Sequence, residues 1–340
     1  VNTVYLIGDA GDISSDDPLI PLVNRRLNEH SETNNALIFL GDNIYHNGLP
    51  AGNDPDRSEK EKIIINQMDI ASGYQGNVFF IPGNHDWDDA GEEGLTAVRR
   101  EEEFVEDYLG KGNSFHPDNG CPGPVAVNLG EDLLLILIDS QWWLHKHEIP
   151  QGEDCSPGSK EAFTSNLVDL VQSNSERNIL LAGHHPVLSN GEHGGRFGIK
   201  DHIFPLTNVR NYLYIPLPVI GSIYPIARSA GVSRQDTPNK VFKTYSAVID
   251  SVSKIHDRLL YASGHDHNLQ YIEKNNVRQI VSGSGSKVKY VSKGRGADFV
   301  YQERGYACIR YYANQQVWID YVAVTDEITG GSVIFRKRLF

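Results

Sequence analysis

The chain has 340 residues, of which 39% are hydrophobic and 9% aromatic, so it can bury a sizeable core as one large domain or two ordinary ones. Its formal net charge of −13 argues against a general affinity for nucleic acid or for an anionic membrane, because those surfaces attract clustered Lys and Arg. Any phosphate ligand must therefore find positive charge locally, and a bound metal ion is the obvious local source.

Along the chain, a short apolar run that stops at a glycine and a polar residue recurs, and each instance predicts a buried strand ended by a turn. The five runs are residues 4–7 before Gly8-Asp9, 36–40 before Gly41-Asp42, 78–82 before Gly83-Asn84, 179–182 before Gly183-His184, and 259–263 before Gly264-His265. A similar run at residues 133–138 precedes Asp139.

Helical patterns lie between these strands, at residues 58–70, 95–109, 159–171 and 240–255, and the first opens with a capping-box match at Ser58 and Glu61. After Gly305 the chain turns to a hairpin-like pair, residues 307–312 and 317–324, with a final strand at 332–336. The alternation predicts layered α/β packing, and the late hairpin predicts a second, more antiparallel sheet.

The segment at residues 196–237 stands apart because it holds several prolines and tyrosines with little periodicity. Two interpretations are open, a surface excursion that only packs on the body and a lid that faces the substrate. Its most apolar stretch, residues 212–227, is too short and too rich in Pro and Gly to span a bilayer, so no transmembrane segment is expected, although the stretch could face a membrane or a partner.

Three cysteines are too few for a disulfide-rich scaffold, and none has the spacing of a zinc motif. Cys121 and Cys155 lie in loop sequence where a bridge is possible, whereas Cys308 falls in a strand and is expected to be a small buried hydrophobe. One possible bridge weakly favours an oxidising compartment.

The ends of the five strands carry oxygen and imidazole donors together. The set comprises Asp9, Asp42, Asn84, His184, His265 and His267. A single Gly-Asp turn or a single histidine is usually structural. Turn formation does not explain why three histidines occur at these strand ends, so the set as a whole indicates a binding site. A dinuclear metal centre needs a bridging carboxylate with terminal oxygen and nitrogen donors, and Asp42 is the candidate bridge. Tyr45, three residues on, would favour Fe(III) as a phenolate, the alternative being ordinary loop packing.

With these motifs the sequence resembles the calcineurin-like metallophosphoesterases and, within them, the purple acid phosphatases. The matching motifs are Gly8-Asp9-Ala10-Gly11, Gly41-Asp42-Asn43-Ile44-Tyr45, Gly83-Asn84-His85-Asp86, Gly183-His184-His185-Pro186 and Gly264-His265-Asp266-His267. Gly11 and Tyr45 select the purple acid phosphatase branch. The resemblance implies a single domain over residues 1–340, an α-β-β-α sandwich of two mixed sheets flanked by helices, with an atypical insertion at about 196–237.

The resemblance also implies roles for individual residues. Asp9, Tyr45 and His267 would bind Fe(III), Asn84, His184 and His265 would bind a divalent ion (Fe, Zn or Mn), and Asp42 would bridge the two. His85 and His193 resemble the histidines that contact phosphate and donate a proton to the leaving group. His185 holds a variable position, so packing and substrate contact are both open for it.

The function expected is a phosphomonoesterase of acid phosphatase type with a metal-bound hydroxide as nucleophile. A phosphodiesterase or pyrophosphohydrolase on the same scaffold is the close rival, and a catalytically silent binding module is a remote one. The partner expected is a small or exposed phosphomonoester and not nucleic acid, and the location expected is extracytoplasmic. The sequence does not predict the oligomeric state.

Overall fold

The structure, a computed structural model, describes residues 1–29, 32–110, 112–208, 212–294, 296–325 and 331–340. The helices are α1 (Leu19–Glu29), α2 (Arg57–Ile70), α3 (Gly94–Leu109), α4 (Ser140–Leu144), α5 (Lys160–Gln172), α6 (Ile199–Ile203), α7 (Ile223–Ser229) and α8 (Lys240–Lys254), and the 3-10 turns are η1 (Asp118–Gly120), η2 (Gly152–Asp154), η3 (Glu192–Gly194), η4 (Pro205–Asn208) and η5 (Ile220–Ser222). The strands are β1 (Asn2–Ile7), β2 (Ala36–Phe39), β3 (Asn77–Phe80), β4 (Val125–Asn128), β5 (Leu133–Leu137), β6 (Asn178–Ala182), β7 (Leu259–Ser263), β8 (Leu269–Lys274), β9 (Val277–Ser282), β10 (Ala297–Tyr301), β11 (Gly305–Tyr311), β12 (Val317–Ala323) and β13 (Ser332–Arg338).

Two mixed sheets form the centre of the molecule. One has the strand order β13-β12-β11-β1-β2-β3 and the other β10-β8-β9-β7-β6-β5-β4. In the first, β1, β2 and β3 run parallel with Ile7 opposite Phe39 and Phe39 opposite Phe80, so their carboxyl ends lie at one edge. In the second, β5, β6 and β7 run parallel in the same way. The five strands of the recurring motif are thus divided between the two sheets.

The prediction that the late hairpin belongs to a separate antiparallel sheet was wrong. β11 pairs antiparallel with β1, and β12 and β13 continue outward from it, so the hairpin extends the N-terminal sheet. In the other sheet, β4 pairs antiparallel with β5, and β8 pairs antiparallel with both β9 and β10, which the sequence pattern did not indicate. Strand order depends on contacts between distant segments, which local periodicity does not encode.

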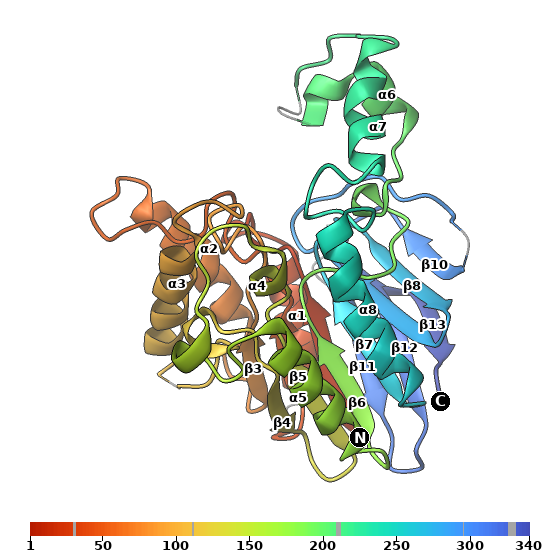
Figure 1. The fold of residues 1–340 in the computed structure, drawn as a ribbon. Helices are drawn as coiled ribbons and strands as arrows, with labels where there is room; N and C mark the ends of the chain where they lie inside the picture. Colours follow the sequence, from red (N-terminus) through yellow and green to blue (C-terminus); the bar gives the residue numbers. More distant parts are fainter. Residues whose placement is uncertain (30–31, 111, 209–211, 295, 326–330) are drawn as a thin grey trace.

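The core is layered because alternate residues of each strand point to opposite faces of its sheet. Val4 and Leu6 of β1 lie with Leu180 of β6 and Leu260 of β7 in the apolar layer between the sheets. Tyr5 and its alternating neighbours pack instead against the helices. Helices flank both sheets, with α2 and α3 on one side and α5 and α8 on the other (Figure 1). The predicted α-β-β-α fold class is confirmed.

The predicted helices are present with small shifts at their ends. α5 begins as expected after Ser159, whose hydroxyl accepts a hydrogen bond from the backbone N–H of Ala162 at 3.1 Å. α2 begins one residue before Ser58, and its N-cap residue is Asp56, so the capping box expected there is not formed. No helix in the described ranges is both long and apolar enough to cross a membrane.

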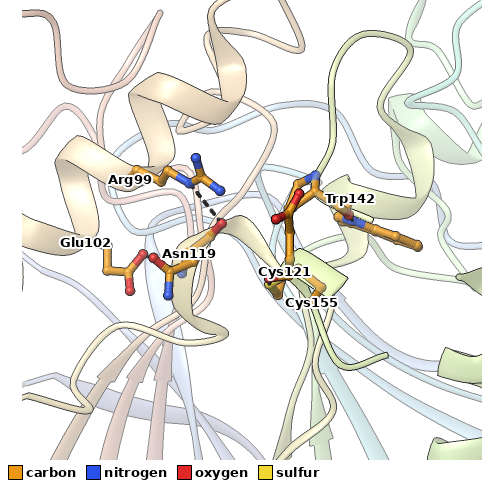
Figure 2. Close-up of a disulfide and its surroundings, with 8 residues drawn as sticks. Arg99, Glu102, Asn119, Cys121, Trp142 and Cys155 are labelled. Atoms are coloured by element: carbon orange, nitrogen blue, oxygen red, sulfur yellow. Dashed lines mark hydrogen bonds between the residues drawn. A yellow bond between two sulfur atoms is a disulfide. The ribbon is translucent and has the colours of Figure 1, made fainter. Parts of the chain in front are cut away.

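Cys121 and Cys155 are joined in a disulfide, with their Cα atoms 5.7 Å apart (Figure 2). Cys121 directly follows η1, and Cys155 directly follows η2, so the bridge ties two surface loops together. Helix α3 holds the first loop independently, because Arg99 donates to the carbonyl of Asn119 at 3.1 Å, as Figure 2 shows. Cys308 is a buried free thiol, as expected.

Candidate metal centre

The loops that follow the parallel strands bring the predicted donors together where the two sheets meet. Asp9 follows β1, and its carboxylate accepts a hydrogen bond from the backbone N–H of His265, which follows β7 of the other sheet, at 2.8 Å. The backbone N–H of Asp9 donates to the carbonyl of Gly41 at 3.0 Å, which joins the loops after β1 and β2. Residues more than 250 positions apart in sequence therefore share one site.

The backbone of these loops adopts unusual conformations at the donors themselves. Asp9, Asp42 and His265 have φ angles of 58°, 53° and 66°, in the left-handed region that non-glycine residues adopt rarely and at a cost. Gly41 has a φ of +88°, and a Cβ atom there would lie 2.7 Å from Nδ1 of His184. The glycine that ends the strand thus lets the histidine loop approach closely, which is a reason beyond turn formation for its presence.

The first group of donors consists of Asp9, Tyr45 and His267. The Tyr45 hydroxyl lies 3.2 Å from Oδ1 of Asp9 and 3.1 Å from Nε2 of His267, and that nitrogen is 3.3 Å from the same carboxylate oxygen. Burial, and then the carboxylates of Asp9 and Asp42, raise the pKa of the Tyr45 phenol well above its usual value. A phenolate at this position therefore requires a cation beside it.

The second group consists of His184, His265 and Asn84. Nε2 of His184 and Nδ1 of His265 lie 3.2 Å apart. Nδ1 of His184 lies 2.7 Å from the carbonyl of Leu40, and Nε2 of His265 lies 3.0 Å from the carbonyl of Gln235. Carbonyls only accept hydrogen bonds, so these two outer nitrogens carry protons. Burial opposes protonation of the His184 ring, but the Asp42 carboxylate raises the pKa of His184 to about 9, so without a cation the inner nitrogen of His184 carries a proton in the space between the two inner nitrogens. A shared cation fits between them.

Asn84 supplies a second sign that a cation fits. Its side-chain oxygen is buried and has no hydrogen-bond partner among the described residues. A buried polar atom without a partner is costly, and a metal ion removes that cost. Carboxylate, amide oxygen, imidazole and phenol together form a donor set suited to an iron or zinc pair.

Asp42 lies between the two groups. Its Oδ1 atom is 3.3 Å from Nε2 of His184, and its carboxylate also lies within 4.8 Å of the donor atoms of Asp9 and His267. Burial opposes its ionisation, but His184 and His85 hold the pKa of the Asp42 carboxyl well below its usual range. Asp42 is thus an anion in contact with both groups, the position that a bridging ligand must occupy.

A cavity of about 450 Å³ opens beside the donors. Among the residues that line it are Asp42, Asn84, His85, His265 and His267. The lining also includes His193 and residues from the end of the 196–237 segment, namely Tyr224, Ala227, Arg228, Val232, Ser233 and Gln235. For these residues of the segment, the structure favours the interpretation that they face the site.

His85 and His193, the two predicted proton donors, both line this cavity. Nδ1 of His85 donates to the carbonyl of His46 at 2.6 Å, which leaves Nε2 on the side of Asp42, 3.9 Å from Oδ2. Nδ1 of His193 lies 2.9 Å from Oδ1 of Asp236, and the His193 ring packs against the ring of His265 with centroids 3.6 Å apart and the planes tilted by 42°.

The structure distinguishes the two alternatives for His185. The side chain is fully buried, with Nδ1 2.7 Å from the Ser140 hydroxyl and Nε2 2.6 Å from the Gln235 side-chain oxygen. Both ring nitrogens are therefore occupied within the protein, which favours packing over substrate contact. Asp86, next to His85 in the sequence, accepts hydrogen bonds from the backbone N–H groups of Asn43 and Gly83.

Sequence analysis missed Gln235 and Asp236. The Gln235 backbone carbonyl accepts from His265 and lies 3.2 Å from Nδ1 of His193, while its side chain contacts His185. Asp236 is fully buried and binds both His193 and Arg228, whose Nε donates to Oδ2 at 2.8 Å. Burial raises the pKa of Asp236, but the hydrogen bonds from Arg228 and His193 outweigh it and hold that pKa below its usual value. The polar run at 234–236, after a long apolar stretch, was the available signal.

The family model for calcineurin-like phosphoesterases matches residues 3–283, a span that contains all five strand-end motifs. The chain belongs to this family. The predicted resemblance is therefore confirmed at family level, and this metallophosphoesterase shares its donor motifs with a group of phosphoester hydrolases. A search of curated protein sequences gives no significant match.

Solved structures with the same fold include three of different description. The GAP50 anchor in the inner membrane complex of Plasmodium is 16% identical, with a TM-score of 0.58 and coverage of 99% of this metallophosphoesterase and 87% of that chain. Purple acid phosphatase PPD1 from yellow lupin seeds is 11% identical, with a TM-score of 0.59 and coverage of 99% and 53%. PhoD is 10% identical, with a TM-score of 0.57 and coverage of 99% and 71%. The chain thus spans about half of the lupin enzyme, and at these identities the likeness shows the fold alone.

Proposed function

We propose that this metallophosphoesterase is a two-metal phosphomonoesterase of the purple acid phosphatase type. The observation that carries the proposal is the position of the Asp42 carboxylate between the two donor groups. It lies within 4.8 Å of the donor atoms of Asp9 and His267 in the phenol-containing group and 3.3 Å from Nε2 of His184 in the histidine-containing group. The family typically binds two metal ions, and the donor set here has a place for each.

Residues of the chain would divide the work of binding as follows. Asp9, Tyr45 and His267 would hold Fe(III), because anionic oxygen suits a hard trivalent ion. Asn84, His184 and His265 would hold a divalent ion (Fe, Zn or Mn), and Asp42 would bridge. When bound, such an ion pair lowers the pKa of water and neutralises phosphoryl oxygens.

The remaining polar side chains of the cavity supply proton transfer and orientation. His85 and His193 flank the cavity, and each has one ring nitrogen held inside the protein and the other free to contact a phosphate or a leaving oxygen. Asp236 orients His193 by accepting from its Nδ1. No serine or cysteine nucleophile is needed in this scheme. Gln235 contacts His265, His193 and His185 and so keeps the loops that carry them in place.

The test of substrate class compares hydrolysis of a simple aryl phosphate monoester with hydrolysis of the corresponding diester. The proposal expects the higher kcat/KM for the monoester, whereas a strong preference for the diester would replace it with the phosphodiesterase alternative. Absence of hydrolysis by the metal-loaded protein with either compound would favour a silent binding module.

The test of the metal assignment combines elemental analysis with a visible spectrum. Asp42→Ala is expected to lose both ions, since it removes the ligand common to both groups, whereas Asn84→Ala is expected to lose only the divalent ion. Tyr45→Phe is expected to abolish a tyrosinate-to-iron absorption band. An active wild-type protein without iron and without that band would overturn the Fe(III) assignment but not the two-metal site.

A further inference from the structure

The part of the 196–237 segment that projects from the body carries an unusual amount of exposed apolar surface. We call residues 196–234 the arm; it includes α6 and α7 and extends beyond the edge of the sheets (Figure 1). Ten of the fifteen large hydrophobic side chains exposed in the described residues belong to it, although it is about a ninth of the chain. The most exposed are Val219 (86%), Ile199 (79%), Val232 (74%), Tyr212 (66%), Ile223 (65%), Ile220 (64%) and Ile226 (62%). Such a concentration marks an interaction surface.

The described residues of the arm, 196–208 and 212–234, contact one another. α6, η5 and α7 contact one another, and the backbone N–H of Leu217 donates to the carbonyl of Ile203 at 2.8 Å. The side chains of α7 lie in two different environments. Tyr224 and Arg228 line the cavity, whereas Ile223 and Ile226 are exposed to solvent. The exposed apolar side chains therefore lie on a fixed surface next to the candidate site.

The charge of the arm is opposite to that of the whole chain. No Asp or Glu occurs between Asp201 and Asp236, in a chain with 44 acidic residues among 340, and both of these carboxylates are buried. Arg196 and Lys200 are exposed, and the ammonium group of Lys200 lies over the ring of Tyr214 at 5.1 Å. The net negative charge of the rest of the molecule repels an anionic surface. The arm lacks this negative charge, so an anionic surface can approach it.

We propose that the arm docks this protein on the surface of an anionic lipid bilayer. Val219, Ile220 and Ile223 enter the boundary between headgroups and acyl chains, the tyrosines lie at headgroup level, and the cations lie near the lipid phosphates. A second copy of the chain fits less well, because pairing two arms brings like charges together. The proposal is independent of the phosphatase assignment. It also limits the expectation that the net charge disfavours binding to an anionic membrane, because that expectation applies to the chain as a whole and not to the arm.

The experiment is a vesicle flotation assay with the full chain, using vesicles of phosphatidylcholine alone and vesicles that also contain phosphatidylglycerol. Binding is expected only to the second kind. The double variant Ile220→Ser/Ile223→Ser is expected to weaken that binding by about tenfold or more, because two exposed isoleucines lose their transfer into an apolar layer. The matched control Ile255→Ser/Val333→Ser removes two exposed apolar side chains outside the arm and is expected to bind as the wild type does.

The outcomes separate the proposal from its competitors and from the proposed function. Failure to bind either vesicle, equal binding to both, or equal weakening by both double variants would each overturn it. A concentration-dependent dimer that disappears in Ile220→Ser/Ile223→Ser without vesicles would assign the surface to a second copy instead. Hydrolysis of a soluble aryl phosphate is expected to be unchanged in this variant, so loss of docking and loss of catalysis are distinguishable.

Discussion

The fully buried carboxylate of Asp236 accepts a hydrogen bond from Nδ1 of His193 at 2.9 Å and so turns the other ring nitrogen of His193 toward the cavity. His193 follows β6 and Asp236 lies at the end of the 196–237 segment, so the contact connects a strand-end loop to that segment. Arg228, bound to the same carboxylate through Nε, holds it in place.

Asp236→Asn is expected to lower kcat for an aryl phosphate by about tenfold or more with a small change in KM, because a supporting partner that orients a site histidine is typically worth 10–100-fold. Metal content, measured by elemental analysis, is expected to stay at the wild-type level, since the Gln235 carbonyl still holds His265. Asp250→Asn on the exposed side of α8 serves as the control. Wild-type kcat in the Asp236 variant would remove this contact from catalysis.

His85→Ala is expected to lower kcat by roughly 10²–10⁴-fold, the usual contribution of a general acid. Both metal ions are expected to remain, because the backbone N–H of residue 85, which donates to Asp42 at 3.0 Å, survives the substitution. His46→Ala is the matched control: its ring lies beside His85, but the contact to His85 uses the backbone carbonyl. Equal losses in the two variants would argue against proton transfer by His85.

His145 is expected to make the protein less stable in acid. Burial, and then the charges of His147 and Lys146, lower the pKa of His145 to about 4. The unfolded chain therefore binds a proton that the folded chain excludes, and stability is lost as pH falls from about 6.5 toward about 4.

Urea unfolding checks this prediction. His145 is expected to lower the free energy of unfolding by on the order of 2 kcal/mol between pH 7 and about pH 5. The variant His145→Gln is expected to lack this contribution to the pH dependence. His202→Gln, at a histidine in the arm with part of its surface exposed, is expected to keep the full pH dependence. An identical pH dependence in the His145 variant and the wild type would contradict the assignment.

Loss of the Cys121–Cys155 disulfide is expected to lower the free energy of unfolding by about 3–4 kcal/mol, because the bridge closes a loop with a sequence separation of 34 and restricts the unfolded chain. The double variant Cys121→Ser/Cys155→Ser and the reduced wild type are expected to unfold at the same denaturant concentration. A reductant is expected to have no effect on the double variant. Unfolding of the reduced wild type at the oxidised midpoint would show that the bridge does not contribute.

Local sequence patterns predicted much of the scaffold. An apolar strand, its turn glycine and the donor that follows are contiguous, so Gly41-Asp42 and Gly264-His265 could be recognised without knowledge of their neighbours. The four predicted helices are present with their ends shifted by only a residue or two, whereas α1 was not predicted, although Leu19, Leu22, Val23 and Leu27 form a buried face on it. The irregular segment at 196–237 has no such period, so its short helices α6 and α7 were not predicted.

The sequence by itself determined which donors this protein offers and on which strand ends, because the chemistry of a side chain and the turn that presents it are local properties. Only the tertiary structure decided that Asp42 lies between two donor groups, that β11 pairs with β1, and that Gln235 contacts three histidines. These contacts join segments separated by tens to hundreds of residues, and their free energy comes from the packing of whole layers, which no local window of the chain contains.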